Sequence, residues 1–383
     1  MNEPKLKFPE FKGEWEEKKL GELLTYEQPT PYLVTDTNYK KSGIPVLTAG
    51  KTFILGYTDE THGVYDNLPV IIFDDFVTES KFVDFPFKVK SSAMKMLKLL
   101  DENNNLHLIY ELMQLLQYPV KEHKRYWISE YSRLTIPLPP SPAEQQKIAS
   151  CLSAMDDLIA AQAEKVEVLK EKKMGLMQQL FPQNGETTPR LRFPEFTGEW
   201  EEKNINDCFE FKQGVQCPVD LQALQKKDGY IRFIRIIDLT QSSEPPRYIA
   251  DPGLAHHICK EDLFMVRYGS PGLVGYGYEG VIANNLFRLL PKFDMCTKFF
   301  KDILTALHKN IAALCGIGAL PAINFSTLGL LRISLPPTIA EQQKIADCLS
   351  ALDDQIAAET EKLTALKDYK KGLMQQLFPQ PAK

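Results

Sequence analysis

The stretch AEQQKIASCLSAMDDLIAAQAEKVEVLKEKKMGLMQQLFPQ occupies residues 143–183, and a second copy of it occupies residues 340–380. About 30 of the 41 aligned positions are identical, which identifies an internal duplication. The chain is therefore organised around one long element that it contains twice.

Both copies predict a long helix with a coiled-coil seam, because apolar residues recur at alternating steps of four and three. The first seam comprises Ile148, Leu152, Met155, Ile159, Val166, Leu169, Leu176 and Leu180, and the second comprises Ile345, Leu349, Leu352, Ile356, Leu363, Leu366, Leu373 and Leu377. Polar residues interrupt the two seams at matching places, at Gln162 and Lys173 and at Glu359 and Lys370. Such interruptions help to fix the register of a coiled coil.

Each helix also has start and stop signals. Ser141 and Thr338 are capping hydroxyls, each followed three residues later by a glutamate, and a Phe-Pro pair ends each copy. At about 1.5 Å per residue, roughly 38 residues form a rod about 57 Å long, which cannot bury its apolar stripe alone. We therefore predict that the two helices pack as an antiparallel coiled coil about a pseudo-two-fold axis. The alternative is that each helix belongs to a separate bundle core.

The composition excludes several classes of protein. The 383 residues suggest two or three domains, and no apolar run or amino-terminal signal segment argues for a membrane span or export. Seven cysteines without a CxxC pair indicate a reduced, cytoplasmic chain. A net charge of −5 argues against a general polyanion binder, so any nucleic-acid surface must be local or shared with a partner.

A shorter repeat precedes the rest of each half: LKFPEFKGEWEEK at residues 6–18 and LRFPEFTGEWEEK at residues 191–203. We predict that Trp15 and Trp200 staple these lead-in segments onto neighbouring elements. The chain then comprises a lead-in segment at 1–18, a first block at 19–140, a helix at 141–182, a polar linker with the second lead-in segment at 183–203, a second block at 204–337 and a helix at 338–380.

The two blocks have little identity but a common layout. Each has two apolar strands (43–49 and 68–73; 230–239 and 262–268), a polar turn and another strand, an amphipathic helix (106–117; 297–310) and a last strand (134–140; 331–337). This layout predicts an α/β or α+β domain with a mixed sheet. The two helices stay nearly identical while the two blocks diverge. We therefore expect both helices to have the same function, and the two blocks to perform two different versions of a second function.

No catalytic motif supports an enzyme: the chain has no P-loop, no HExxH and no serine elbow, and the blocks share no catalytic set. Three weaker patterns are the glycine-rich run 269–277, the group Asp75, Glu79 and Lys81, and the group His256, His257 and Cys259. The first pattern looks like a phosphate-binding loop but is expected to be a glycine-rich hairpin. The second is similar to the pattern of a metal-dependent nuclease, but its carboxylates are only four residues apart and the second block has no counterpart. The third could bind a metal ion, but no second pair of ligands follows at the required spacing.

Polar and basic residues at predicted strand ends are the candidate DNA contacts, since arginine and lysine pair with guanine, asparagine with adenine, and others hold phosphates. They are Lys51, Thr52, Lys81, Lys90, Ser91, Ser92 and Lys95 in the first block, and Arg232, Arg235, Arg267, Tyr268, Ser270, Asn284, Asn285 and Arg288 in the second. The alternative is a solvated strand rim.

The paired GEWEEK segments, the two LPPxxAEQQKI helix starts and the two GLMQQLFP endings resemble the specificity subunit of type I restriction-modification systems. The resemblance covers essentially the whole chain. It implies two target recognition domains, each reading one half of a split double-stranded DNA sequence, separated by two helices that set the gap. The shorter first block and its acidic residues Asp74, Asp75 and Glu79 depart from what is usual beside DNA.

The resemblance also implies partners. Two modification subunits would carry S-adenosylmethionine and methylate adenine, and two restriction subunits would add ATP- and Mg-dependent translocation and cleavage, while this chain has no catalysis or cofactor of its own. The helix residues that would form scaffold and partner surface are Glu144, Gln145, Gln146, Ile148, Leu152, Ile159, Glu341, Gln342, Gln343, Ile345, Leu349 and Ile356. The alternative function is a protein-interaction scaffold with two unlike binding domains on a coiled-coil spacer.

Overall fold

The structure is a computed structural model that describes residues 4–50, 52–116, 118–120, 124–183, 186–241, 244–315 and 321–379. The chain divides into two compact units. The first unit comprises Met1–Ala163 with Glu361–Lys383, and the second comprises Glu164–Thr360. Each unit therefore contains one block, part of α3 (Pro142–Leu180) and part of α9 (Ile339–Leu377).

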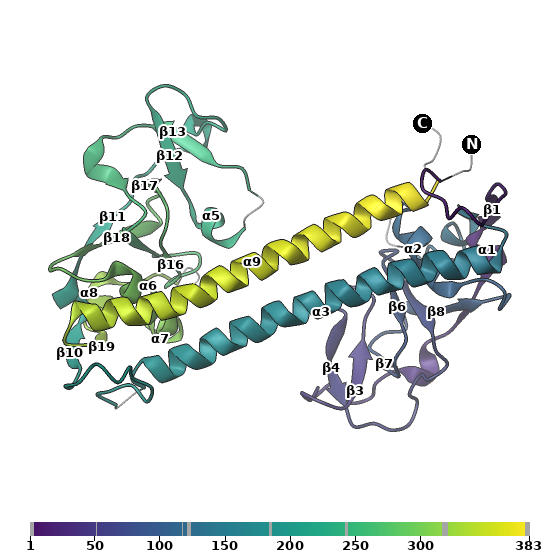
Figure 1. The fold of residues 1–383 in the computed structure, drawn as a ribbon, viewed down its shortest axis with the longest axis horizontal. Coiled ribbons are helices and arrows are strands. Elements are labelled where there is room, and N and C mark those ends of the chain that lie inside the picture. The colour runs from purple at the N-terminus through teal and green to yellow at the C-terminus, as the bar shows by residue number, and fades with distance from the viewer. Residues whose placement is uncertain are drawn as a thin grey trace. The chain divides into compact units, whose positions relative to one another are not determined.

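The two long helices are antiparallel within each unit (Figure 1). In the first unit, Leu152 near the start of α3 and Leu377 at the end of α9 share one hydrophobic cluster. In the second unit, Leu349 near the start of α9 and Leu180 at the end of α3 share another. Every predicted seam residue is buried or half-buried, so the predicted coiled-coil pair is confirmed. The helix ends also join the cores of the blocks, so part of each stripe is covered by its own block.

The first block follows the order of strands and helices that the sequence layout indicated. Its elements are β1 (Glu16–Lys19), α1 (Leu20–Leu23), β2 (Leu24–Glu27), β3 (Ile44–Leu47), β4 (Ile54–Thr58), β5 (Val70–Asp74), β6 (Ser80–Val83), β7 (Lys88–Val89), β8 (Met94–Leu99), α2 (Leu106–Gln114) and β9 (Thr135–Leu138).

The second block repeats this order and adds, among the described residues, the strand β14 and the helices α5, α7 and α8. Its elements are β10 (Glu201–Asn204), α4 (Ile205–Cys208), β11 (Phe209–Gln213), β12 (Tyr230–Ile234), α5 (Ile236–Thr240), β13 (Arg247–Ala250), β14 (His257–Ile258), β15 (Leu263–Val266), β16 (Val274–Gly275), β17 (Gly280–Ile282), β18 (Leu286–Pro291), α6 (Thr297–Ala306), α7 (His308–Ala313), α8 (Phe325–Gly329) and β19 (Arg332–Leu335).

The sheets of the two blocks have the same topology. An antiparallel sheet has the order β2-β8-β5-β6 in the first block and β11-β18-β15-β16 in the second. A second, mixed sheet has the order β4-β3-β7 in the first block and β13-β12-β17-β14 in the second. Its parallel pairs are β3 with β7 and β12 with β17. A third sheet in each block is a pair of strands, β1-β9 or β10-β19. The predicted α/β class is confirmed, but each block has three sheets where the sequence indicated one mixed sheet.

The lead-in segment of each half closes its block by pairing with the last strand. β1 pairs antiparallel with β9, and β10 pairs antiparallel with β19. Trp15 and Trp200 are both buried, and each donates its indole N–H to a glutamate at the start of a long helix, to Glu144 at 3.4 Å and to Glu341 at 3.2 Å. The predicted tryptophan staples are therefore confirmed.

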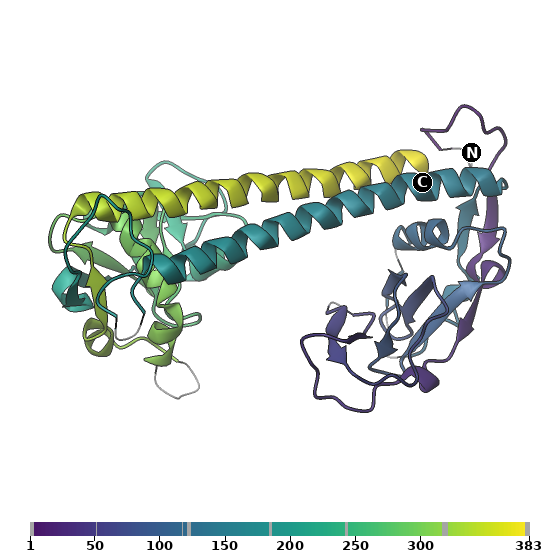
Figure 2. The ribbon, with the colours of Figure 1, turned by 60° about the horizontal axis from the view of Figure 1, so that its bottom comes forward.

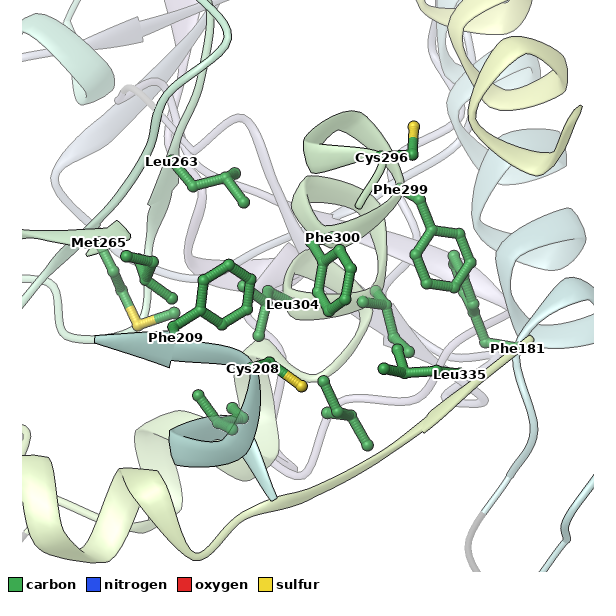
Figure 3. Packing of buried hydrophobic residues seen from close by; sticks show 14 of the residues in the cluster. Phe181, Cys208, Phe209, Leu263, Met265, Cys296, Phe299, Phe300, Leu304 and Leu335 are labelled. Atoms are coloured by element: carbon green, nitrogen blue, oxygen red, sulfur yellow. The ribbon is translucent and has the colours of Figure 1, made fainter. Parts of the chain in front are cut away.

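The principal core of each unit lies where the antiparallel sheet, the block's helix and the ends of the long helices meet. In the second unit, aromatic rings fill this space: Phe209 and Phe300 lie 5.0 Å apart, and Phe299 contacts both Phe181 and Trp200 (Figure 3). A separate cluster fills the space between the two sheets of each block. Each block is thus joined to the long helices through its core.

Three predicted elements need correction. The strand predicted over 230–239 ends at Ile234, because α5 begins where Asp238 accepts a hydrogen bond from the amide of Arg235 and caps the turn. The helix predicted over 297–310 divides into α6 and α7 at Leu307. The helix predicted over 106–117 ends at Gln114, and Gln117 lies outside the described residues, as do Asn184 and Gly185 of the linker.

The glycine-rich run 269–277 is a hairpin, as predicted. It connects β15 to β16, and Gly275 packs directly against the ring of Phe264, where a side chain would not fit. No helix in the part of the chain that the structure describes has both the length and the apolar content needed to cross a membrane.

Candidate nucleic-acid interface

The parallel strand pair of each block brings two chain segments to one edge of the mixed sheet. The amide of Lys90 donates to the carbonyl of Leu47 at 3.1 Å, and the amide of Ala283 donates to the carbonyl of Ile234 at 2.9 Å. We call the residues that follow these strands the carboxyl edge. It comprises residues 48–50, 52–53 and 90–93 in the first block, and residues 235–238 and 283–285 in the second. Arg232 of β12 is counted with the second edge because its guanidinium donates to Asp238.

The carboxyl edge of the first block presents exposed hydroxyls and a lysine. Thr52, Lys90, Ser91 and Ser92 are all exposed, and the Lys90 ammonium lies 5.7 Å from the centre of the Tyr39 ring. The sequence predicted these four as DNA contacts, and the structure brings them to one place. Lys51, predicted with them, lies outside the described residues.

Other predicted residues of the first block lie elsewhere. Lys81 is half-buried on β6 in the antiparallel sheet. Lys95 is buried, and its ammonium lies 3.2 Å from the carboxylate of Asp75 and 4.2 Å from the centre of the Tyr26 ring. Asp75 also accepts the amide of Trp127 at 2.8 Å. Lys95 is therefore a core residue and not a DNA contact, and the charge of Asp75 is compensated inside the block.

The carboxyl edge of the second block contains two arginines held by one aspartate. Arg232 and Arg235 donate to the Asp238 carboxylate at 2.6 and 3.0 Å. The Asp238 side chain is only 2 % exposed. Burial raises the pKa of Asp238, but the bonds from Arg235 and Arg232 outweigh burial and hold that pKa below its ordinary value. Both guanidinium groups are therefore fixed before any nucleic acid arrives.

Two asparagines complete this edge. Gln213 donates through its side chain to the carbonyl of Asn284, and the amide of Arg267 donates to the carbonyl of Asn285 at 2.9 Å. The side-chain oxygen of Asn285 is buried without a hydrogen-bond partner among the described residues. Leaving such an acceptor unpaired costs free energy.

The remaining predicted residues of the second block serve its own packing. The Arg267 guanidinium donates to the Gln213 side chain at 3.0 Å and stacks on Phe325 at 4.7 Å. Arg288 lies on β18, where it contacts Asp262 at 3.4 Å. Tyr268 forms an isolated bridge with Ala322, and the Ser270 carbonyl accepts the amide of Leu273 inside the hairpin. The prediction that Arg267 and Arg288 face DNA is not supported by these contacts.

The repeated Glu-Gln-Gln motif at the helix starts ties each long helix to its block. Gln145 accepts the amide of Asn105 at 2.8 Å, and Gln342 accepts the amide of Cys296 at 3.0 Å. Asn105 and Cys296 are the N-cap residues that immediately precede α2 and α6, so each glutamine satisfies a backbone donor at the start of the block's helix.

These contacts correct the predicted partner surface. Eight of its members are buried within this chain and are scaffold residues that no partner can reach: Glu144, Gln145, Ile148, Leu152, Glu341, Gln342, Ile345 and Leu349. Ile159 and Ile356 are half-buried in the seam. Gln146 and Gln343 are exposed, and for these two the partner role remains a prediction.

Sequence reasoning missed Asp238 and Gln213, the residues that engage the arginines. The signal for Asp238 was present, because an acidic residue three positions after Arg235 is a capping pattern. No local signal marks Gln213, which reaches Arg267 across 54 residues.

Similarity to known proteins extends over most of the chain. The model of the type I restriction modification DNA specificity domain matches twice, at residues 12–171 and 197–368. The specificity subunit of the type I restriction enzyme EcoR124I/EcoR124II from Escherichia coli is 33 % identical over 377 residues, which cover 90 % of this chain and 88 % of that protein. The MjaVIII specificity subunit from Methanocaldococcus jannaschii is 23 % identical over 97 % of this chain and 93 % of its own length.

A solved structure has the same fold. The type I restriction-modification S subunit from M. genitalium superposes with a TM-score of 0.65 at 17 % identity, covering 99 % of this chain and all of that one. Both matched regions of the family model contain one block together with most of one long helix, so the duplication seen in the sequence is a duplication of the family's domain.

Proposed function

Because the chain belongs to the type I restriction-modification DNA specificity family, we propose that it selects the DNA sequence on which such a complex acts. Each block reads one half of a bipartite target, and the paired helices set the distance between the halves. The observation that carries this proposal is the repeated block topology with unlike carboxyl edges. The alternative function, a scaffold that binds two unlike proteins, does not explain why the chain belongs to a DNA specificity family.

The side chains at the two carboxyl edges suit base and phosphate contacts. Lys90 pairs with guanine or with a phosphate, and serine hydroxyls donate to or accept from either. Asparagine pairs with adenine through two hydrogen bonds, which suits Asn284 or Asn285. The two edges carry different residue types, so the two half-sites differ in sequence.

Catalysis is assigned to partner subunits. Modification subunits would supply S-adenosylmethionine and methylate an adenine in each half-site, and restriction subunits would supply ATP- and Mg-dependent cleavage. A chain with a net charge of −5 gains little from phosphate neutralisation alone, so the partners also add basic surface around the duplex. The seven cysteines without disulfides suit the reducing cytoplasm as the place of action.

Methylation mapping tests this proposal. The chain is co-expressed with modification subunits in a host without other adenine methylation, and the modified adenines are sequenced. The expected result is one bipartite motif with a constant gap. Methylation at a single half-site, or at no common motif, would contradict the proposal.

The role of the helices as a ruler has its own test. Four residues inserted together near Gln162 and near Glu359 add about one turn to each helix, or about 6 Å. The expected motif keeps both half-sites and has a longer gap. An altered half-site with an unchanged gap would count against the ruler.

A further inference from the structure

Two of the four polar interruptions of the seams, Lys173 and Lys370, belong to partly buried ion clusters, in which the side chains of Asp156 and Asp353 are 42 % and 39 % exposed. Lys173 and Lys370 occupy the same position in the two helix copies, and each side chain is only 15 % exposed. A leucine at either position would continue the apolar seam, so these lysines need a reason beyond stability.

In the first unit, Lys370 of α9 connects three helices. Its ammonium lies 2.7 Å from the carboxylate of Asp156 on α3 and 2.8 Å from that of Glu111 on α2. Glu111 is 2 % exposed, and His107 of α2 lies 3.6 Å from it. Burial lowers the pKa of Lys370, but its bonds to Asp156 and Glu111 raise that pKa above its ordinary value, so the lysine keeps its charge.

The second unit has the corresponding cluster. Lys173 of α3 donates to Asp353 of α9 at 2.6 Å, and Asp353 also accepts Lys301 of α6 at 3.0 Å. Lys301 in turn lies 2.9 Å from Asp302, which is 1 % exposed. Asp353 is the counterpart of Asp156 in the helix repeat. Three helices again meet at one cluster of charges.

The acidic residue on the block's helix is also a counterpart. Gln145 and Gln342 align in the repeat, and they accept the amides of Asn105 and Cys296. Counting six residues onward from these two gives Glu111 and Asp302. Two blocks with little identity have therefore kept an acid at the point where they meet the long helices.

His107, Glu111 and Asp156 also form a group of possible metal ligands, with donor atoms within 4.8 Å of one another. The Lys370 ammonium already bonds to both carboxylates, so the cluster has its own cation.

We propose that these two clusters are register clamps: Lys370 with Asp156 and Glu111, and Lys173 with Asp353, Lys301 and Asp302, fix how the long helices align with each other and with the block. A buried ion group contributes little net stability, but any shift of one helix leaves a charge without its partner, which is costly. By fixing this alignment, the residues of the two clamps would set the spacing between the two half-sites. This inference rests on the proposed function.

The test compares spacer lengths. Duplexes with the native gap, and with gaps one base pair shorter and longer, are methylated by the complex assembled with its modification subunits. The first clamp is neutralised without changing side-chain size by E111Q/D156N/K370M. The matched control is K165M, which removes an exposed lysine that contacts Glu359 at 2.9 Å between the same two helices.

The clamp variant is expected to methylate the off-length duplexes at least tenfold more, relative to the native gap, with both half-site sequences unchanged. The control is expected to match the wild type. A folded clamp variant with the wild-type ratio would overturn the inference. If the wild-type complex methylates duplexes of all three gap lengths equally, the proposed function fails and not the clamp alone. The two failures are therefore distinguishable.

A charge exchange covers the case in which the triple variant does not assemble. K370D places a third acid in the cluster and is expected to relax the gap preference. D156K/K370D restores opposite charges on the two helices and is expected to recover it. Wild-type gap preference in K370D, or no recovery in the exchanged pair, would each contradict the clamp.

Discussion

The first and second blocks share their topology but differ at the edge that we assign to DNA. Both have the same order in the antiparallel sheet, a lead-in strand paired with the last strand and a tryptophan staple, and the mixed sheet differs only by the added edge strand β14. At the carboxyl edge, the first block presents an exposed lysine and serines, whereas the second has two arginines fixed on Asp238 and two half-buried asparagines. What is retained connects each block to the long helices, and what has diverged lies at the strand ends.

The difference shows how one fold can hold two specificities. The topology depends on buried apolar strands, and loops after strands tolerate change because they carry little of the core. The contacts that join block and helix involve buried polar groups, which cannot change singly without leaving a partner unsatisfied.

The largest expected effect comes from the staples, which are not equally strong. Glu341 is buried and bonds both Arg192, at 2.8 and 2.9 Å, and Trp200. Glu341→Ala leaves the Trp200 donor without its partner and takes the carboxylate from Arg192, whose guanidinium keeps its bonds to the carbonyls of Thr197 and Gly198, and is expected to cost about 1.5–3 kcal/mol of unfolding free energy. The Glu144 carboxylate accepts a longer bond, 3.4 Å, from Trp15, so Glu144→Ala is expected to cost about 1–2 kcal/mol.

Urea unfolding of both variants beside the wild type measures this contrast. Equal losses would show that the Arg192 contact adds nothing, and the two staples would then be equivalent.

The next effect concerns target sequence. Asn284→Ala with Asn285→Ala is expected to weaken discrimination in one half-site by about 1–3 kcal/mol per lost base contact. Ser91→Ala with Ser92→Ala is expected to affect only the other half-site. Methylation rates on duplexes with single-base changes measure both, and Asn310→Ala, an exposed residue on α7, is the control. If both double variants discriminate between base sequences as the wild type does, the alternative is favoured, in which these residues form a solvent-exposed rim and do not contact DNA.

Alanine at Arg232, Arg267 or Arg288 is a poorer test of base reading. These arginines bond to groups in their own block, so their loss would disturb the fold as well as any DNA contact.

A smaller effect is expected at the helix starts. Gln145→Ala and Gln342→Ala each remove an acceptor from the first turn of α2 or α6, at an expected cost of about 0.5–2 kcal/mol. Gln145 also donates to the carbonyl of Pro139 at 2.9 Å and to the Asn104 side chain at 3.2 Å, so Gln145→Ala is expected to cost more than Gln342→Ala. Thermal unfolding measures both losses, and an equal or smaller loss for Gln145→Ala would show that these two further bonds add no stability.

The smallest effect is specific to the first block. Glu60 accepts a bond from Lys88 and from the amides of Asp36 and Thr35, and these contacts lower its pKa to about 2 from the ordinary 4.5. A lowered carboxyl pKa adds stability that is full above pH 4.5 and is lost as the pH falls towards 2. The difference in Tm between wild type and Glu60→Gln should therefore shrink over that range. A constant difference would contradict the ionic contribution.

The sequence predicted those features that depend on local pattern and repetition. The two long helices, their antiparallel pairing and the staples at Trp15 and Trp200 follow from periodicity and from duplicated signals. The pairing of β1 with β9 joins segments more than a hundred residues apart, and GEWEEK has no strand pattern of its own, so it could not be anticipated.

The candidate site was only partly predictable for a similar reason. Thr52, Lys90, Ser91 and Ser92 follow the parallel strands β3 and β7 and lie exposed at one edge of the mixed sheet, and their contact with DNA stays a prediction. Whether an arginine is available depends on its partner, and Gln213 and Asp238 reach their arginines through the fold. Residue type at a strand end therefore predicts a surface, but not which side chains in it remain available.

The most direct measurement replaces residues 204–337 with residues 19–140, so that both positions carry the first block. Since the long helices are antiparallel in both units, the account predicts methylation of an inverted repeat of the first half-site with about the native gap. Retention of the second half-site, or loss of any repeated half-site in an assembled complex, would contradict the claim that each block reads its own half.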